Sequence, residues 1–169
     1  MLNAVVDSTV LVSAFLRKGG VSDVLLRRAA DGAFVLSLSH AIVTETETVL
    51  LERERIRRRY PYTNEDVAEF CQMLQRSFPL LTDLPPLTGI VRDPNDDMVL
   101  ATACAARATY LITRDLDLLS YGSPIFKAVQ QKRCKALYTA LTKSPKSPEY
   151  AVGEGSERSN VARSVAVPP

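Results

Sequence analysis

The chain alternates short apolar runs with longer stretches in which apolar residues recur every three or four positions. The short runs, at residues 4–6, 34–38 and 109–113, are typical of buried strands. Other stretches have the spacing and the end signals of helices. They are residues 9–16, 22–30, 40–53, 64–76 and 95–107. This alternation predicts an α/β fold with a parallel sheet covered on both faces.

Turn residues and polar composition divide the rest of the chain. Prolines and a glycine punctuate residues 79–91, which indicates a connector with room for one short strand. Residues 144–169 are rich in Pro, Ser, Gly and charge, which is typical of a disordered tail. We therefore expect one globular domain within residues 1–143, a length that suits a single hydrophobic core.

The composition narrows the possible chemistry. The chain of 169 residues is 46% hydrophobic and 24% charged, with a net charge of +2, as in ordinary globular proteins. Three widely spaced cysteines suggest neither a disulfide framework nor a thiolate metal site, so we expect a cytoplasmic protein. No stretch has the apolar length of a membrane span. With His40 as the single histidine, any metal would be held by oxygen ligands.

Two acids directly follow predicted strands. Asp7 comes after residues 4–6, and Asp115 comes two residues after 109–113. In an open parallel sheet, ligands bind beyond the carboxyl ends of the strands, so both acids are in positions where a site is expected. Each acid by itself is more readily explained as a helix N-cap than as a ligand.

Further acids come from two predicted helices. The helical repeat places Glu45 on an apolar face, where a carboxylate needs a partner. In the stretch R-D-P-N-D-D-M, Asp93 and Pro94 are suited to start a helix, while Asp96 and Asp97 lie in its first turn. If these acids meet Asp7 and Asp115, a cation must compensate their charge. Carboxylate and water ligands favour Mg²⁺ or Mn²⁺.

Four motifs, in this order, carry a resemblance to a known family. They are V-V-D-S-T-V-L-V-S-A, E-T-E-T-V-L, D-P-N-D-D-M-V-L-A-T-A and Y-L-I-T-R-D-L-D-L-L. Over residues 2–121 the chain resembles PIN-domain ribonucleases, and most of all the VapC-like toxins of type II toxin-antitoxin systems. The resemblance implies a three-layer fold with a central parallel sheet of four to five strands flanked by helices. It also implies an Mg²⁺-dependent endoribonuclease that cleaves RNA, forms a homodimer and binds a cognate antitoxin protein.

The resemblance also assigns roles to the acids. Asp7, Glu45, Asp96 and Asp115 match the catalytic positions of the family, and the metal ligands are expected among Asp7, Asp96, Asp97 and Asp115. The motif D-P-N-D-D favours Asp96, whereas the spacing back from T-R-D favours Asp97. Both remain open, with Asp96 preferred.

Contacts with RNA are expected from basic and hydroxyl side chains. The run R-E-R-I-R-R-R supplies Arg53, Arg57 and Arg58 as candidates for phosphate binding, although the same run also fits a solvated helix end. Ser8 and Thr113 flank the acids and are candidate hydrogen-bond donors at the substrate site. Ordinary roles at a helix start and a strand end explain them as well.

The chain departs from the family pattern at two places. Thr9 stands where Asn is frequent, and residues 122–143 lack the usual ending, so we expect the final strand to be altered or missing. That departure keeps open an alternative, a catalytically inactive PIN-like module that binds RNA or protein. An aspartate-nucleophile phosphotransferase fits less well, because Thr9 occupies the place of its second acid.

Overall fold

The centre of the molecule is a parallel sheet. A computed structural model describes residues 2–91, 93–120 and 127–130. Its five strands have the order β3-β2-β1-β4-β5, and every pairing is parallel. The strands are β1 (Asn3–Val6), β2 (Val35–Ser39), β3 (Leu80–Leu81), β4 (Tyr110–Thr113) and β5 (Lys127–Gln130).

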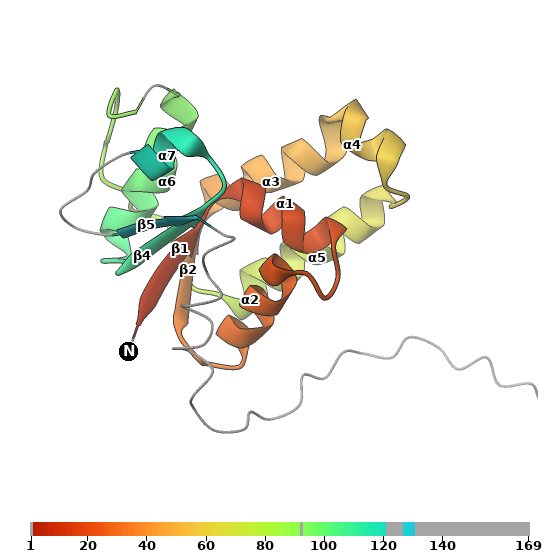
Figure 1. Cartoon of the computed structure of the whole chain (residues 1–169), viewed down its shortest axis with the longest axis horizontal. Coiled ribbons are helices and arrows are strands. Elements are labelled where there is room, and N and C mark those ends of the chain that lie inside the picture. Colours follow the sequence, from red (N-terminus) through yellow and green to blue (C-terminus); the bar gives the residue numbers. More distant parts are fainter. Residues whose placement is uncertain (1, 92, 121–126, 131–169) are drawn as a thin grey trace, which may run out of the picture.

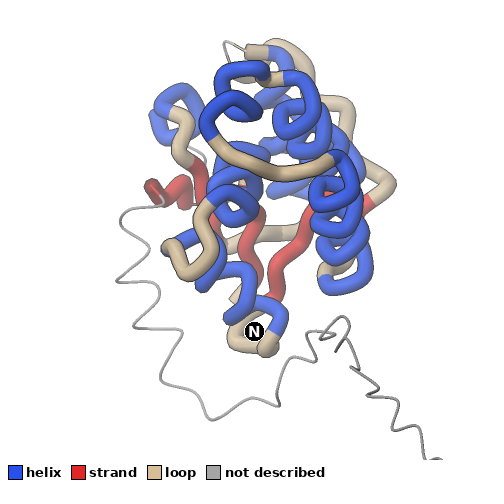
Figure 2. The backbone as a smooth tube through the Cα atoms, turned by 90° about the vertical axis from the view of Figure 1, so that its right-hand side faces the viewer, coloured by secondary structure: helices blue, strands red, loops and turns tan. Residues whose placement is uncertain are grey.

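Helices cover the sheet on both sides. They are α1 (Ser8–Leu16), α2 (Val21–Ala30), α3 (His40–Glu52), α4 (Glu54–Arg59), α5 (Asn64–Ser77), α6 (Pro94–Ala105) and α7 (Leu116–Ser120). Figure 1 shows α6 on one side of the sheet and α1, α2 and α5 on the other. In Figure 2 the strands run next to one another beneath the helices. The predicted α/β fold with a covered parallel sheet is therefore confirmed.

The core lies where the sheet meets these helices. In β1, Ala4, Val5 and Val6 are fully buried, because this central strand is covered on both faces. Leu11 of α1 and Leu100 of α6 are also buried. Burying one such leucine contributes about 2 kcal/mol to the free energy of folding. The central strand and its two covering helices thus form a rigid support for the loops that follow the strands.

Most predicted elements occur within one or two residues of the expected bounds. The basic run forms a separate helix, α4, and the two-residue strand β3 lies in the connector. The final strand was expected to be altered or missing, and the second alternative was wrong, because β5 pairs with β4 along the edge of the sheet. Its apolar run, Ala128 and Val129, is too short for the pattern to indicate a strand. Residues 122–126 and 131–143 and the tail 144–169 lie outside the described residues.

Local signals explain where several helices begin. The side chains of Thr63 and Asp66 exchange hydrogen bonds with each other's backbone N–H in a capping box at the start of α5. Ser39, the last residue of β2, caps α3 by accepting from the N–H of Ile42. Helices long and apolar enough to span a lipid bilayer are absent from the described parts of the chain.

Candidate active site

The candidate site lies beyond the carboxyl ends of β1 and β4. Because these strands are parallel neighbours, the residues that follow them lie at the same edge of the sheet. Asp7 directly follows β1, and Asp115 lies two residues after Thr113, where β4 ends. The backbone N–H of Asp7 donates to the carbonyl of Ile112, 3.3 Å away, and this bond extends the pairing to the site.

Asp7 is buried and heavily hydrogen-bonded. Its Oδ1 accepts from the hydroxyl of Thr9 at 2.8 Å and from the N–H of Val10 at 2.9 Å, so Asp7 also caps α1. Its Oδ2 accepts from the hydroxyl of Thr113 and, at 3.4 Å, from the N–H of Arg114. Burial raises the pKa of Asp7, and these hydrogen bonds oppose the rise. Thr9 thus supplies a hydroxyl where Asn is frequent in the family.

Thr113 connects the two acids. Its hydroxyl donates to Oδ2 of Asp7 and accepts from the N–H of Asp115 at 2.8 Å. Thr113 is fully buried and Ser8 is 5% exposed, so neither residue presents its side chain to solvent. The structure does not support the expected direct contact of these two residues with RNA. It gives Thr113 the role of holding the carboxylate of Asp7 and the backbone of Asp115 in place.

Glu45 reaches the site from α3, one turn beyond the start of that helix. Its carboxylate is half-buried, and burial is the main cause that raises its pKa. An interaction with the side chain of Ser8 opposes that rise, while the negative charges of Asp7 and Asp93 add to it. The charge of Arg53, at the end of α3, lowers the pKa slightly. Glu45 therefore lies close enough to Asp7 for the two charges to repel each other.

Asp96, in the first turn of α6, has a strongly perturbed pKa. Burial, together with the surrounding negative charges, raises its pKa to about 7. Those charges belong, in decreasing order of effect, to Asp115, Asp93, Glu45 and Asp7. The structure thus places Asp7, Glu45 and Asp115 close enough for their charges to act on Asp96, the fourth acid that the sequence selected. It adds Asp93, which the sequence indicated only as a helix-starting residue.

Asp97 points to a different partner. Although it adjoins Asp96, it is only 2% exposed, and its carboxylate accepts backbone N–H groups from the loop before α6. The donors are Gly89, Ile90 at 3.0 Å and Val91 at 3.1 Å. Gly89 has a φ of 68°, which favours glycine and turns the loop toward Asp97. The structure therefore favours Asp96 as the acid that faces the site and gives Asp97 the role of anchoring the loop.

A pair of buried hydroxyls ties α6 to α3. The hydroxyl oxygens of Thr102 and Ser39 are 2.9 Å apart, and both residues are fully buried. Thr102 also bonds the carbonyl of Met98, 2.7 Å away, within α6. Because Ser39 caps α3, this contact ties the start of the helix that carries Glu45 to the second half of the helix that carries Asp96.

The arginines of α4 lie at the other end of α3. Figure 1 shows α4 far from the sheet, and the rise along α3 from Glu45 to Glu52 alone is roughly 10 Å. Arg57 stacks on the ring of Tyr62, with 5.2 Å between its guanidinium carbon and the ring centroid. Arg58 pairs with Glu54 in the same helix. These contacts give Arg57 and Arg58 partners within the fold, whereas Arg53 is the candidate whose charge acts on a site acid.

The chemistry of the site fits a divalent cation. The charged side chains gathered there are carboxylates, and the main influences on the pKa values of Asp7 and Asp96 are burial, hydrogen bonds and the other acids. Among the described residues, no three acids, histidines or cysteines are already drawn together into a metal-binding group. Asp7 and Asp115 instead make internal hydrogen bonds, the latter by accepting from the N–H of Asp117 at 2.7 Å. Small side-chain movements toward a cation would relieve the repulsion among the acids.

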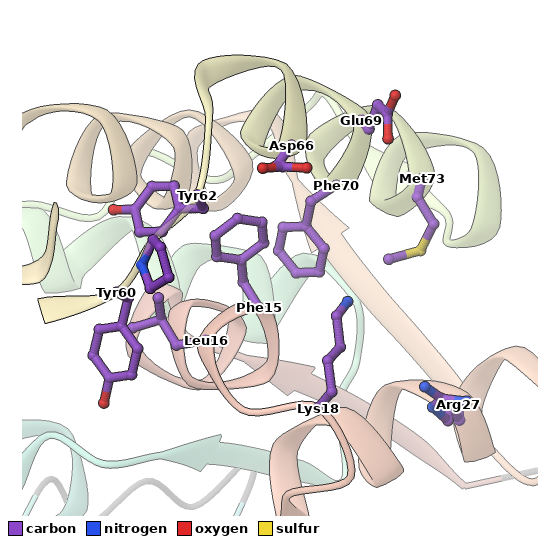
Figure 3. A pocket seen from close by; sticks show the side chains of 11 residues that line it. Phe15, Leu16, Lys18, Arg27, Tyr60, Tyr62, Asp66, Glu69, Phe70 and Met73 are labelled. Atoms are coloured by element: carbon purple, nitrogen blue, oxygen red, sulfur yellow. The ribbon is translucent and has the colours of Figure 1, made fainter. Parts of the chain in front are cut away.

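A separate groove opens between α1 and the start of α5. Its volume is about 770 Å³, and aromatic side chains form its floor. Phe15 contacts Tyr62 edge-on and Phe70 at a tilt, with ring centroids 5.1 and 5.2 Å apart. Figure 3 shows Lys18 and Arg27 on one side of this groove and Asp66 and Glu69 on the other. None of the site acids lines it, so this groove and the acidic site are distinct surfaces.

The architecture defines an α/β domain with an acidic site beyond the carboxyl ends of its central strands. The chain matches the PIN domain family over residues 3–117, and it belongs to that family. The matched range contains all four acids. PIN domains are generally nucleases, and divalent metals are typical of them. A comparison with curated proteins found no significant match.

Proposed function

We propose that this PIN-domain protein is a metal-dependent endoribonuclease that hydrolyses RNA phosphodiester bonds. The observation that carries the proposal is the arrangement of Asp7, Glu45, Asp96 and Asp115, which come from separate segments and lie close enough that burial and the other acids raise the pKa of Asp96 to about 7. Helix capping alone does not require acids from separate segments to meet. A site that concentrates negative charge in this way is suited to bind Mg²⁺ or Mn²⁺.

Asp7, Asp96 and Asp115 are the residues that would hold the cation. When bound, the metal would make water more acidic and offset negative charge on the scissile phosphate. Glu45 is suited to orient that water, because its half-buried carboxylate has a raised pKa and accepts a proton more readily than an exposed glutamate does. Thr113 would keep the carboxylate of Asp7 and the backbone of Asp115 in their relative positions during the reaction.

Asp97 and Asp93 have supporting parts in this proposal. Asp97 anchors the loop that precedes α6 and so fixes the position of Asp96, rather than ligating the metal itself. Asp93 adds negative charge near Asp96 and Glu45, which strengthens the attraction for a cation.

The biological role that we propose is that of a toxin in a type II toxin-antitoxin system. This part rests on the resemblance of the four motifs to VapC-like toxins, with a homodimer and a cognate antitoxin protein as partners. A small gene immediately upstream, whose product co-purifies with this protein and inhibits it, is the expected finding. Expression without that product should arrest growth, and Asp7→Asn should abolish the arrest.

An RNA cleavage assay tests the catalytic part. Purified full-length protein is incubated with total RNA in Mg²⁺, in Mn²⁺ and in excess chelator. Cleavage with either metal that disappears in chelator and in Asp7→Asn supports the proposal. If wild type and Asp7→Asn both leave the RNA intact in each metal while still binding it, the chain is instead a catalytically inactive RNA-binding module.

A further inference from the structure

A basic and an apolar side chain lie where β4 leads into α7, on either side of Asp115. Arg114 and Leu116 alternate with Thr113 and Asp115, whose groups are engaged in the site. Arg114 is exposed, and Leu116 is 72% exposed. Leu116 is the first residue of α7, and its neighbour Leu118 is fully buried, so α7 is anchored without help from Leu116.

Arg114 is held close to the acids by its backbone. Its N–H donates to Oδ2 of Asp7, and the next residue in the chain is Asp115. In the described part of the chain, the guanidinium of Arg114 makes no ion pair. The backbone of Arg114 is thus fixed beside the carboxylates, and its exposed guanidinium is available to bind a phosphate. The arginines of α4, by contrast, lie beyond the far end of α3 (Figure 1).

We infer that Arg114 and Leu116 form the substrate-contact edge of the acidic site, where Arg114 binds a backbone phosphate and Leu116 packs against an unpaired base of RNA. This inference rests on the proposed ribonuclease function. Phosphates that flank the scissile bond would pass beside the acids that hold the cation, and Arg114 directly precedes Asp115 in the chain while its backbone N–H is bonded to Asp7. A large apolar side chain exposed to water gains from covering the face of a base.

A site edge that combines Arg114 with Leu116 favours single-stranded RNA. Base faces are available only where the bases are unstacked, whereas a duplex offers phosphates and groove edges. Leu116 should therefore discriminate between the two forms, and Arg114 should not. The consequence for the enzyme is a preference for loops or unpaired segments, set by the residue that follows Asp115.

The test compares two variants with matched controls. Leu116→Ser is paired with Val21→Ser, because Val21 is also the first residue of a helix and is 42% exposed, away from the acids. Arg114→Ala is paired with Arg17→Ala, an exposed arginine at the opposite end of α1 from Asp7. Binding of full-length protein to labelled oligo(A), and to its duplex with oligo(U), is measured by fluorescence anisotropy in Ca²⁺ at several salt concentrations. Melting temperatures check that each variant is folded.

We expect Leu116→Ser to weaken oligo(A) binding about fivefold without changing its salt dependence, and to leave duplex binding unchanged. Arg114→Ala should weaken binding to both RNAs and reduce the salt slope on oligo(A) by about 0.7, as for one lost phosphate contact. Equal affinities of Leu116→Ser and Val21→Ser for oligo(A), or equal slopes of the two arginine variants, would overturn the inference. RNA cleavage that depends on Asp7 would persist in that case, which separates failure of this inference from failure of the proposed function.

Discussion

Replacing Asp96 with Asn should stabilise the metal-free protein. The pKa of Asp96 is raised from 3.8 to about 7, a change of about three pH units, mainly by burial and by the charges of neighbouring acids. At about 1.4 kcal/mol per unit, the ionised carboxylate would cost at most ~4 kcal/mol. Because this side chain is only half-buried, solvent screening reduces that cost to roughly 1–2 kcal/mol.

The start of α6 works in the opposite direction. A carboxylate in the first turn of a helix interacts favourably with the N-terminal dipole, by about 0.5 kcal/mol, and Asn loses that interaction. The net gain of Asp96→Asn is therefore about 1 kcal/mol, which raises the melting temperature of a protein of this size by roughly 2–4 °C.

The gain should depend on pH in a defined direction. A carboxyl group whose folded-state pKa is raised stabilises the fold while it is protonated, and this contribution is lost as the pH rises from about 4 to about 7. The difference in melting temperature between Asp96→Asn and wild type should thus be largest above pH 7 and vanish near pH 4. Differential scanning fluorimetry in chelator, at a series of pH values, measures it.

The neighbouring acid provides a matched control of opposite sign. Asp97→Asn removes a carboxylate that accepts three backbone N–H groups, and an amide with a single oxygen cannot satisfy all of them. We expect a loss of about 2 kcal/mol, or roughly 4–8 °C. If Asp96→Asn also lowers the metal-free melting temperature above pH 7, then Asp96 acts only as a helix-starting acid and the assignment of a charged cluster fails.

Three further changes test the surroundings of the site. Thr113→Val removes the hydroxyl that bonds Asp7 and the backbone N–H of Asp115, so it should lower the unfolding free energy by about 1–3 kcal/mol and reduce RNA cleavage more than tenfold. Thr113→Ser should restore both stability and cleavage. Unchanged cleavage by the Thr113→Val variant would refute the role of the hydroxyl. Arg57→Ala should lower the melting temperature by roughly 2–4 °C, because its stacking on Tyr62 is lost, and should leave the affinity for RNA unchanged. A variant that binds RNA more weakly but melts at the wild-type temperature would instead indicate that Arg57 contacts a phosphate. Addition of Mg²⁺ should raise the melting temperature of wild type more than that of Asp7→Asn, and equal shifts in scanning fluorimetry would argue against Asp7 as a ligand.

The sequence was most informative where a pattern repeats along the chain. The strands and the longer helices follow from apolar periodicity, and the positions of Asp7 and Asp115 follow from the rule for parallel sheets. The pattern missed β5, because a short edge strand contributes too few apolar residues. It also could not decide between Asp96 and Asp97, since adjacent residues in a first helical turn differ only in direction. That direction depends on the hydrogen bonds from the loop at residues 89–91 to Asp97, which are tertiary contacts that the helical pattern does not reveal.

In this fold the same acids begin helices and form the candidate site. Asp7 caps α1, Asp115 accepts from the N–H of Asp117 in α7, and Asp96 lies in the first turn of α6. Each helix start carries a partial positive charge, and these charges offset part of the repulsion among the acids when no metal is bound. The same hydrogen bonds that begin the helices therefore keep the carboxylates together at the edge of the sheet. Capping is thus the means by which this chain assembles an acidic site from separate segments, and a capping signal at the end of a parallel strand does not argue against function.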